Sequence, residues 1–368
     1  MKLEIEKKDL LNLIGKTQNI VEKRNTMPIL VNILLETQET NLKVFATDLE
    51  VSLTDEVRCQ VLQNGKVGVS AKNLFDIVKE LKDGTLILER KDNNWLEIKQ
   101  GKYTSKIVGI SAEEYPIFPT FNSPYFYNLD AKIIRDMIDK TIYSISSDET
   151  RYHLNGVYFE LNITSGLKMV ATDGHRMSLI NKTIQDSQNK VNQGVIIPRK
   201  GLNEIKKILD NVDETVEFSI EGSQFILKNK STVLMIRLIE GKYPNYQQFI
   251  PQKLTQKVLI NKEAFLSSLK RVSLLANQKS KAVLLNISKG RLEISSNNPE
   301  LGDAKEEMEI EYSGTELKIG FNAKYITDIL SSIDDEIIDF EINDQISPGI
   351  IRPHNDASYT CVIMPMRI

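Results

Sequence analysis

The sequence predicts an α+β protein of three tandem domains, each made of two similar half-units, and three observations support this. A strand-like stub followed by an amphipathic helix recurs near residues 3, 129 and 258, at intervals of about 126 and 129 residues. Strand-like runs follow each of these helices. A second segment of strand, turn, helix and strand then completes each third of the chain. The chain therefore contains six α+β half-units, two in each domain.

The first half-unit of each domain begins with a helix, predicted over residues 7–24, 131–146 and 261–281. Apolar residues fall at helical spacing in each of them, as at Leu10 and Ile14 in the first. The strand-like runs that follow contain "FATDLE" and "VATDGH", which are two copies of one element. A third copy, "ISSNNPE", has diverged.

The second half-units read "VGVSAKNLFDIVKELKDGTLILER", "VIIPRKGLNEIKKILDNVDETVEFSI" and "LKIGFNAKYITDILSSIDDEIIDFEI". Each is a strand, a turn, an amphipathic helix and a strand. Segments rich in Pro, Asn and Ser near residues 122–128 and 251–256 indicate the domain boundaries. The predicted domains are residues 1–122, 128–251 and 256–368.

Composition is that of a soluble globular protein, because 41% of the 368 residues are hydrophobic and 26% are charged. No apolar run approaches the ~20 residues of a membrane-spanning helix. The N-terminus "MKLEIEKKDL" carries charges where a signal peptide has its apolar region, so we expect a cytoplasmic protein. Cys59 and Cys361 lie far apart without CxxC spacing, which indicates neither a disulfide framework nor a zinc site. No cofactor or metal is expected.

Positive and negative charges are distributed unevenly between the predicted helices and the rest of the chain. The net charge of −3 argues by itself against a nucleic-acid binder. The six predicted helices together carry +11, however, which leaves −14 for the rest of the chain. A basic helical surface would contact the backbone of duplex DNA, since too few aromatic residues interleave with the lysines to favour stacking on single strands. The alternative is that these lysines and arginines only lie on the solvent-facing surfaces of the helices.

Four segments carry a resemblance to a known family: "RYHLNGVYFE", "ATDGHRMS", "VIIPRKG" and the terminal "MPMRI". Together they resemble the bacterial DNA polymerase sliding clamp, the β subunit of the replicative DNA polymerase III. The resemblance covers the whole chain. It implies a head-to-tail homodimer whose six domains form a ring around duplex DNA, with helices lining the hole and sheets outside. It also implies a non-catalytic processivity factor that tethers the polymerase, the clamp loader, other polymerases and repair factors.

The resemblance further implies three sets of site residues. Contacts to DNA are expected from Arg24, Arg151, Tyr152, His153, Arg199 and Lys200. A hydrophobic groove for short partner peptides is expected from Leu154, Thr172, Gly174, His175, Arg176, Met177, Pro244, Gln248, Phe249, Asn322, Tyr325, Val362, Met364, Pro365, Met366 and Arg367. The seam between two copies is expected to join Leu274 and Leu275 to a strand around Ile107. By helix position alone, further candidates for the lumen are Lys72, Lys206, Lys207, Lys270, Arg271 and Lys324, with a solvated helix face as the alternative.

The chemistry of the terminal segment suits a peptide groove. Methionine is flexible and polarizable, so Met364 and Met366 could adapt to several apolar side chains. Pro365 cannot donate a hydrogen bond to a strand ladder, which favours a strand that has stopped pairing. The alternative is that both methionines are core residues of a last strand. Phe249 is expected to narrow the pocket.

Two other functions remain open at the level of the sequence. In a monomeric α+β enzyme, Asp173 would orient His175 as a general base. Against it, the chain has 3 histidines and shows no nucleophile motif, metal cluster or phosphate loop. The second alternative is a duplex DNA-binding repeat protein that does not form a ring.

Overall fold

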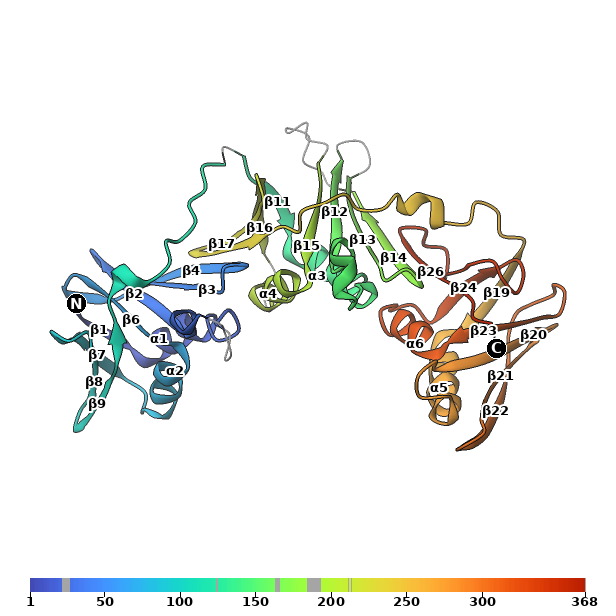
Figure 1. The fold of residues 1–368 in the computed structure, drawn as a ribbon, viewed down its shortest axis with the longest axis horizontal. Helices are drawn as coiled ribbons and strands as arrows, with labels where there is room; N and C mark the ends of the chain where they lie inside the picture. Colours follow the sequence, from blue (N-terminus) through green and yellow to red (C-terminus); the bar gives the residue numbers. More distant parts are fainter. Residues whose placement is uncertain are drawn as a thin grey trace. The chain divides into compact units, whose positions relative to one another are not determined.

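The computed structural model describes residues 1–21, 27–123, 125–162, 166–183, 193–210, 212 and 214–367. The chain divides into two compact units (Figure 1). The first unit comprises Met1–Lys132 and Lys200–Leu238, and the second comprises Ile133–Arg199 and Ile239–Ile368. Each unit is described by itself.

The element order confirms the six half-units. In the described ranges a strand, a helix and three further strands recur six times, with the short strands β5 and β10 added in the first third. The helices are α1 (Lys7–Gly15), α2 (Ala71–Glu80), α3 (Ala131–Asp139), α4 (Arg199–Leu209), α5 (Lys262–Val272) and α6 (Ala323–Ser331). Short 3-10 helices are η1 (Pro28–Val31), η2 (Ala112–Glu114), η3 (Ile142–Ser144), η4 (Glu149–Leu154), η5 (Tyr246–Phe249) and η6 (Ser273–Leu275).

The first unit contains two antiparallel sheets. The five-stranded sheet has the order β5 (Gln60–Gln63), β1 (Lys2–Glu6), β7 (Thr85–Arg90), β8 (Leu96–Gln100), β9 (Tyr103–Ile107). The nine-stranded sheet has the order β10 (Gly109–Ile110), β6 (Gly65–Ser70), β2 (Asn32–Gln38), β3 (Asn41–Thr47), β4 (Val51–Arg58), β18 (Thr232–Arg237), β17 (Gln224–Asn229), β16 (Thr215–Glu221), β11 (Tyr127–Asp130). Pairing of β4 with β18 joins segments that are far apart in the sequence.

The second unit repeats this plan. Its eight-stranded sheet has the order β15 (Gln193–Pro198), β12 (Gly156–Asn162), β13 (Gly166–Thr172), β14 (Arg176–Lys182), β26 (Tyr359–Ile363), β25 (Gly349–Pro353), β24 (Ile337–Ile342), β19 (Gln256–Asn261). The four-stranded sheet has the order β22 (Gly302–Glu309), β21 (Arg291–Asn298), β20 (Ala282–Ser288), β23 (Leu317–Asn322). Here the pairing of β14 with β26 joins distant segments.

A pair of adjacent helices packs against both sheets in each unit (Figure 1). In the first unit α1 contacts α2, β1 and β4. In the second unit α5 contacts α6, β19, β21 and β22. The apolar stripe of each helix is buried, as Leu10 and Ile14 of α1 and Phe265 and Leu269 of α5 show. The hydrophobic effect on these stripes therefore holds the helix pairs on the sheets.

Three predicted helices were too long. The helix predicted over residues 7–24 ends at Gly15, and those predicted over 131–146 and 261–281 end at Asp139 and Val272. At the ends of α1 and α3, nearby side chains donate hydrogen bonds to the last carbonyl groups of the helix. Thr17 Oγ1 donates to the carbonyl of Ile14 at 2.7 Å, and Thr141 Oγ1 donates to that of Met137 at 2.7 Å. Such local bonds compete with continuation of a helix.

Two properties of the described residues bear on function. None of their helices is long and apolar enough to span a bilayer. No group of three or more His, Cys, Asp or Glu side chains among them could hold a metal ion. Cys59 and Cys361 are free thiols, the first partly exposed and the second buried.

Candidate functional site

The turn between β13 and β14 is shaped by its own side chains. Thr172 Oγ1 accepts a hydrogen bond from the backbone N–H of Gly174 at 3.1 Å. Asp173 Oδ1 accepts from the backbone N–H groups of His175 and Arg176, at 2.9 and 3.0 Å. Gly174 has a φ of +89°, which L side chains rarely adopt. The motif "TDGHR" therefore specifies the backbone of a tight turn.

The first repeat has the same turn, and the third has a related turn with asparagine in place of aspartate. Asp48 Oδ1 accepts from the N–H groups of Glu50 and Val51, at 2.9 and 2.7 Å. Asn298 Oδ1 accepts from the N–H of Glu300 at 3.0 Å. An Asp or Asn side chain that binds the backbone two residues on is a common way to stabilise a turn. The aspartate of this motif thus has a structural role that recurs through the chain.

A pocket of about 100 Å³ lies beside the turn of the second repeat. It is lined by η4, the turn with β14, the segment around η5, and β26 with the residue that follows it. The lining residues are Leu154, Thr172, Gly174, His175, Arg176, Met177, Pro244, Phe249, Val362 and Met364. All ten belong to the predicted groove, so the structure brings together segments up to about 200 residues apart in the sequence.

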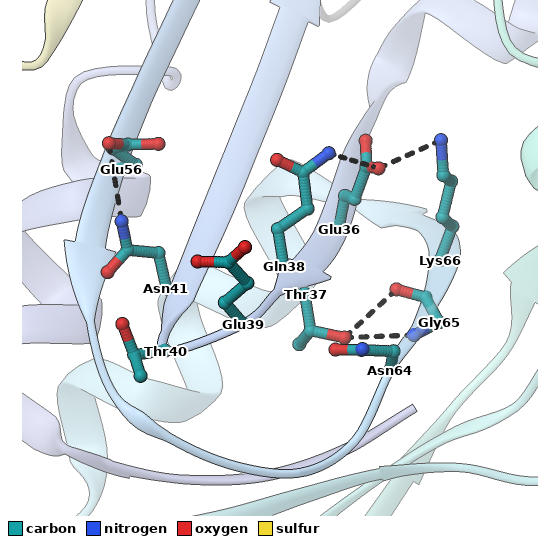
Figure 2. Close-up of a pocket in the computed structure, with 10 residues that line it drawn as sticks. All are labelled: Glu36, Thr37, Gln38, Glu39, Thr40, Asn41, Glu56, Asn64, Gly65 and Lys66. Carbon is teal, nitrogen blue, oxygen red and sulfur yellow. Dashed lines mark hydrogen bonds and ion pairs between the residues drawn. The ribbon is translucent and has the colours of Figure 1, made fainter.

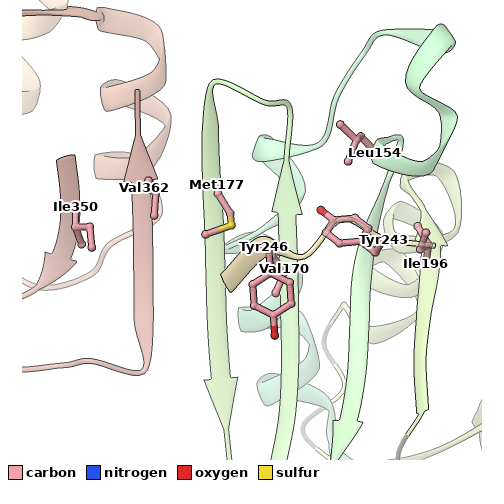
Figure 3. Close-up of a cluster of buried hydrophobic side chains, with 8 residues drawn as sticks. All are labelled: Leu154, Val170, Met177, Ile196, Tyr243, Tyr246, Ile350 and Val362. Atoms are coloured by element: carbon pink, nitrogen blue, oxygen red, sulfur yellow. The ribbon is translucent and has the colours of Figure 1, made fainter. Parts of the chain in front are cut away.

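The floor of this pocket is the end of a buried hydrophobic cluster (Figure 3). Figure 3 shows Met177 on β14 and Val362 on β26 near one another, with Leu154 at the end of η4. Tyr243 and Tyr246 pack into the same cluster from the chain around η5. Because these side chains are fixed by close packing, the pocket is formed before any ligand binds.

The C-terminal segment forms one wall. Strand β26 ends at Ile363, and the backbone N–H of Met364 donates to the carbonyl of His175 at 2.9 Å. Two residues on, the N–H of Met366 donates to the carbonyl of Gly320 in β23 at 2.8 Å. Met364 is 39% exposed. Met364 is therefore not a core residue. The regular ladder of β26 ends at Ile363, but the tail keeps single backbone contacts with His175 and with Gly320, so it has not stopped pairing altogether.

Six predicted groove residues lie outside the lining of this pocket. Gln248 precedes Phe249 in η5, and Pro365 follows Met364. Asn322 caps α6 by accepting the N–H of Lys324 at 2.9 Å. The rings of Tyr325 and His175 are stacked, with centroids 6.4 Å apart. Met366 and Arg367 line a separate pocket of about 560 Å³ over β20, β21 and β22.

Arg176 is held from three sides. Its Nε donates to Asp173 Oδ2 at 3.0 Å, its Nη1 to Asp328 Oδ2 at 2.7 Å, and its Nη2 to the carbonyl of Tyr143 at 2.7 Å. The guanidinium carbon also lies 4.4 Å from the ring centroid of Tyr325. The Arg176 side chain is only 7% exposed. The sequence analysis missed Asp328 and Tyr143, and only proximity in the fold, not spacing in the sequence, reveals them.

Models of the three domains of the DNA polymerase III beta subunit match nearly the whole chain. The N-terminal domain model matches residues 1–119, the central domain model 128–245 and the C-terminal domain model 247–367. The chain belongs to the DNA polymerase III beta subunit family. A beta sliding clamp of Caulobacter vibrioides is 32% identical over 373 residues, with all of both chains covered.

Solved structures of this family have the same fold. The crystal structure of the β subunit from Pseudomonas aeruginosa superposes with a TM-score of 0.96 at 29% identity over the full length of both chains. A second P. aeruginosa sliding clamp structure, bound to griselimycin, has a TM-score of 0.94 at 30% identity and also covers both chains completely. The chain is accordingly a sliding clamp, a non-catalytic processivity subunit of DNA polymerase III.

The enzyme alternative is wrong, and the turn geometry of this β subunit explains why. Both oxygens of Asp173 are engaged, one by backbone N–H groups and the other by the Arg176 guanidinium. The bond from His175 to Asp173 comes from the backbone rather than from the imidazole. The carboxylate therefore does not orient the ring of His175 as a general base would require.

The residues expected to contact DNA fall at several places in the clamp chain. Arg24 lies outside the described residues. Arg151, Tyr152 and His153 belong to η4, the same turn that places Leu154 in the lining of the 100 Å³ pocket, and Tyr152 is 57% exposed. Lys200 is the second residue of α4, and its ammonium forms an ion pair with the buried Asp48.

A second pocket, of about 520 Å³ and lined mostly by polar residues, adjoins the 100 Å³ pocket and shares His175 and Arg176 with it. Arg151, Arg199 and Lys324 also line it. Burial lowers the pKa of the Arg199 guanidinium, and the nearby charge of Arg176 lowers it further. A hydrogen bond from Thr150 lowers the pKa of Asp148, which also binds Arg151 Nε at 2.9 Å. The residues expected to bind DNA and those expected to bind peptides thus share one wall.

The residues expected at the seam of the clamp lie in different units. Ile107, 8% exposed, is the last residue of β9 in the first unit. Leu274 and Leu275 belong to η6 in the second unit, and Leu274 is 76% exposed. An apolar side chain so exposed in one chain is available for contact with another.

A further pocket lies elsewhere, at the β2–β3 hairpin (Figure 2). It measures about 760 Å³ and is polar. Glu36 Oε1 binds Lys66 Nζ at 2.9 Å and accepts from Gln38 Nε2 at 2.9 Å, and the Thr37 hydroxyl is bonded to Gly65. These groups neutralise one another, and none of them belongs to a predicted site.

Proposed function

We propose that two copies of this chain close into a ring around duplex DNA, and that the pocket beside the "TDGHR" turn binds short peptides of the polymerase and of other partners. The observation that supports this most strongly is the convergence of ten predicted groove residues on one preformed apolar pocket. A ring holds DNA topologically, so weak and salt-screened contacts suffice and the clamp can slide.

The pocket suits one side chain of a peptide. Its volume of about 100 Å³ is well below the roughly 300–1,000 Å³ of a site for a whole small ligand. Leu154, Met177 and Val362 supply an apolar floor, while the exposed Met364 can move to admit different anchors. One apolar anchor with a few polar neighbours gives modest affinity, which allows partners to exchange.

On the DNA side, we propose that Arg151, Tyr152, His153, Arg199, Lys200 and Arg24 contact the phosphate backbone. Tyr152 is largely exposed, and Arg151 and Arg199 line one polar pocket, which supports a shared surface. Both residues already have a carboxylate partner, but Lys200 pairs with the buried Asp48, whereas the pair of Arg151 with Asp148 is more exposed. The contribution of Lys200 to DNA affinity should therefore be smaller than that of Arg151. The cytoplasm is the compartment that follows from this function. The domain boundaries near residues 122–128 and 251–256 remain part of the proposal.

The groove assignment is tested by Met364→Glu. A carboxylate at the rim of the apolar pocket would lose hydration whenever a peptide binds, so we expect the dissociation constant of a fluorescent polymerase peptide to rise at least about 30-fold. Leu49→Glu is the matched control, since Leu49 is 51% exposed in the turn of the first repeat. Fluorescence anisotropy measures both. Equal affinity of Met364→Glu and Leu49→Glu would refute the assignment.

Phe249 should select the size of the peptide anchor. Phe249 lines the pocket, so its ring reduces the volume that a peptide side chain can occupy. Phe249 is 52% exposed, so it is not fixed by packing in the core. In Phe249→Val, peptides with a tryptophan or phenylalanine anchor should gain about ten-fold in affinity relative to peptides with a leucine anchor. Competition anisotropy with matched peptides measures this ratio. An unchanged ratio would show that Phe249 does not set anchor size.

A further inference from the structure

The C-terminal tail joins the two sheets of the second unit. The backbone N–H of Met364 donates to the carbonyl of His175, directly before β14, and the N–H of Met366 donates to the carbonyl of Gly320 in β23. In an extended chain, the N–H groups and the side chains of residues two apart point the same way. Met364 lines the pocket of about 100 Å³, and Met366 lines the pocket of about 560 Å³ over the four-stranded sheet. Both pockets therefore lie beside the same face of the tail.

The larger of these two pockets lies on the solvent-facing side of the four-stranded sheet. In β20, Val283 and Leu285 are 1% and 0% exposed, whereas Leu284 between them is partly exposed. Leu284 faces Gly320 across the ladder of β20 and β23, and the lack of a side chain at Gly320 leaves room above the sheet. This pocket is named the sheet trough, and its lining includes Ala282, Leu284, Ser295, Lys305, Met366 and Arg367.

The sheet trough has the size and the lining for a stretch of polypeptide. Its volume of about 560 Å³ is several times that of the apolar pocket of about 100 Å³, which suits one side chain. Leu284 and Met366 are apolar parts of the lining, and Ser295, opposite Leu284 in β21, adds a hydroxyl group. Apolar contacts mixed with hydrogen-bonding groups are typical of surfaces that bind polypeptides. A surface beside the anchor pocket would contact the residues next to the anchor in the same peptide.

Arg367 is the charged group of the sheet trough that lies nearest to the apolar pocket along the chain. Glu293 Oε2 binds Lys305 Nζ at 2.6 Å and Arg291 Nη2 at 3.3 Å, so these charges offset one another. Asp303 is on β22, the strand of the sheet farthest from the tail. Arg367 is exposed and has no ion-pair partner among the described residues. A carboxylate near the anchor of a peptide would complement this charge.

We propose that the sheet trough holds the residues that flank the apolar anchor of a partner peptide, with a carboxylate of the peptide paired to Arg367. This carboxylate lies about three residues from the anchor, because Arg367 lies three residues beyond Met364 and extended chains share one rise of about 3.3 Å per residue. The proposal rests on the peptide groove proposed above. It adds a second contact region and a preference for peptides with an acidic flank.

The test compares three fluorescent peptides by anisotropy on the full-length protein. The core peptide is the five-residue segment of a polymerase peptide centred on its anchor. Two longer peptides add six residues before or after the core, all alanine and serine except for a glutamate directly beside the core, three residues from the anchor. One of the longer peptides should bind about ten-fold more tightly than the core, since it buries further apolar surface and adds one ion pair.

Two variants of the sheet trough should remove this gain without changing the affinity for the core peptide. Leu284→Glu places a charge on the apolar part of the lining, and Ser295→Tyr fills the space by volume. The matched control is Ser288→Glu, because Ser288 lies on the same face of β20, four residues from Leu284, and outside the lining. Ser288→Glu should keep the ten-fold gain. Unchanged binding of the core peptide reports that each variant is folded.

The charge preference is tested with Arg367→Gln and with a longer peptide that carries glutamine in place of glutamate. On the wild-type protein the glutamine peptide should bind about three-fold more weakly than the glutamate peptide, as expected for an exposed ion pair. Arg367→Gln should bind both peptides equally. A three-fold preference that persists in Arg367→Gln would overturn this pair.

The remaining outcomes separate the sheet trough from the groove. Longer peptides that bind like the core, or a gain that survives in both Leu284→Glu and Ser295→Tyr, would overturn the sheet trough and leave the groove intact. A monomer in sedimentation of Leu284→Glu would assign this surface to the contact between two copies instead. A core peptide that does not bind the wild-type protein would overturn the groove and its extension together.

Discussion

Arg176→Ala should weaken peptide binding about ten-fold or more and lower the free energy of unfolding by about 3 kcal/mol, although Arg176 makes its hydrogen bonds within the protein. The substitution leaves Asp173 and Asp328 without the guanidinium that now pairs with both. It also frees the turn whose His175 carbonyl accepts the N–H of Met364. Both walls of the pocket should therefore move. Peptide anisotropy and chemical unfolding measure the two effects.

Lys324→Ala provides the control for this experiment. Lys324 also pairs with Asp328, at 3.0 Å, but its side chain is 65% exposed, so the loss should change stability by less than about 1 kcal/mol. Arg176→Lys should fall between wild type and Arg176→Ala, because an ammonium keeps the charge but not the forked geometry. Wild-type peptide affinity in Arg176→Ala would show that this network does not position the groove.

Deletion of residues 364–368 should abolish peptide binding and leave the dimer intact. The deletion removes the wall formed by Met364 together with its hydrogen bond to His175, and it removes the bond from Met366 to Gly320. Strand β26 ends at Ile363, so the sheet itself is retained. Loss of a central anchor contact typically costs a few kcal/mol, so peptide affinity should fall by about 100-fold or more.

Two measurements on the truncated chain separate the groove from the fold. Anisotropy with a polymerase peptide should show no saturable binding, while sedimentation should show a dimer at the same concentrations as wild type. Retained peptide affinity would contradict the groove assignment. If the truncated chain were a monomer, the C-terminal tail would instead belong to the contact between the two copies.

The sequence predicted the architecture well because the signals were repeated. Helical spacing, the recurring "ATD" element and the boundary segments rich in Pro, Asn and Ser each occur in more than one copy. A pattern that could arise by chance in one repeat is therefore supported by its recurrence in another. The exact helix ends were not predicted, since bonds such as that from Thr17 to the Ile14 carbonyl are made by single side chains.

The residues that line the pocket were predicted from motifs, but the residues that hold them in place were not. Leu154, Met177 and Val362 follow recognisable segments, whereas Asp328 lies 152 residues from Arg176 and has no sequence signal of its own. Lys200 was singled out from its motif, but its ion pair with Asp48 was not predicted, because that pair depends on the packing of α4 in the first unit. Tertiary pairing of charges cannot be read from local patterns, because it depends on which half-units share a sheet.

The internal repeats also explain why one chain is an incomplete structure. Two pairings, β4 with β18 and β14 with β26, join successive repeats within the chain, whereas β9 and β22 are left at the edges of their sheets among the described residues. Exposed strand edges are usually protected in stable monomers. In the proposed dimer, a head-to-tail contact repeated twice closes on itself.

The most direct test of the central claim is retention on DNA of defined topology. The protein is loaded by a clamp loader and ATP onto nicked circular duplex DNA, and half of the sample is then cut once with a restriction enzyme before gel filtration. A ring should stay on the circle and leave the linear molecule through its ends. Equal retention on circular and linear DNA would contradict a ring and favour a protein that binds the duplex without encircling it.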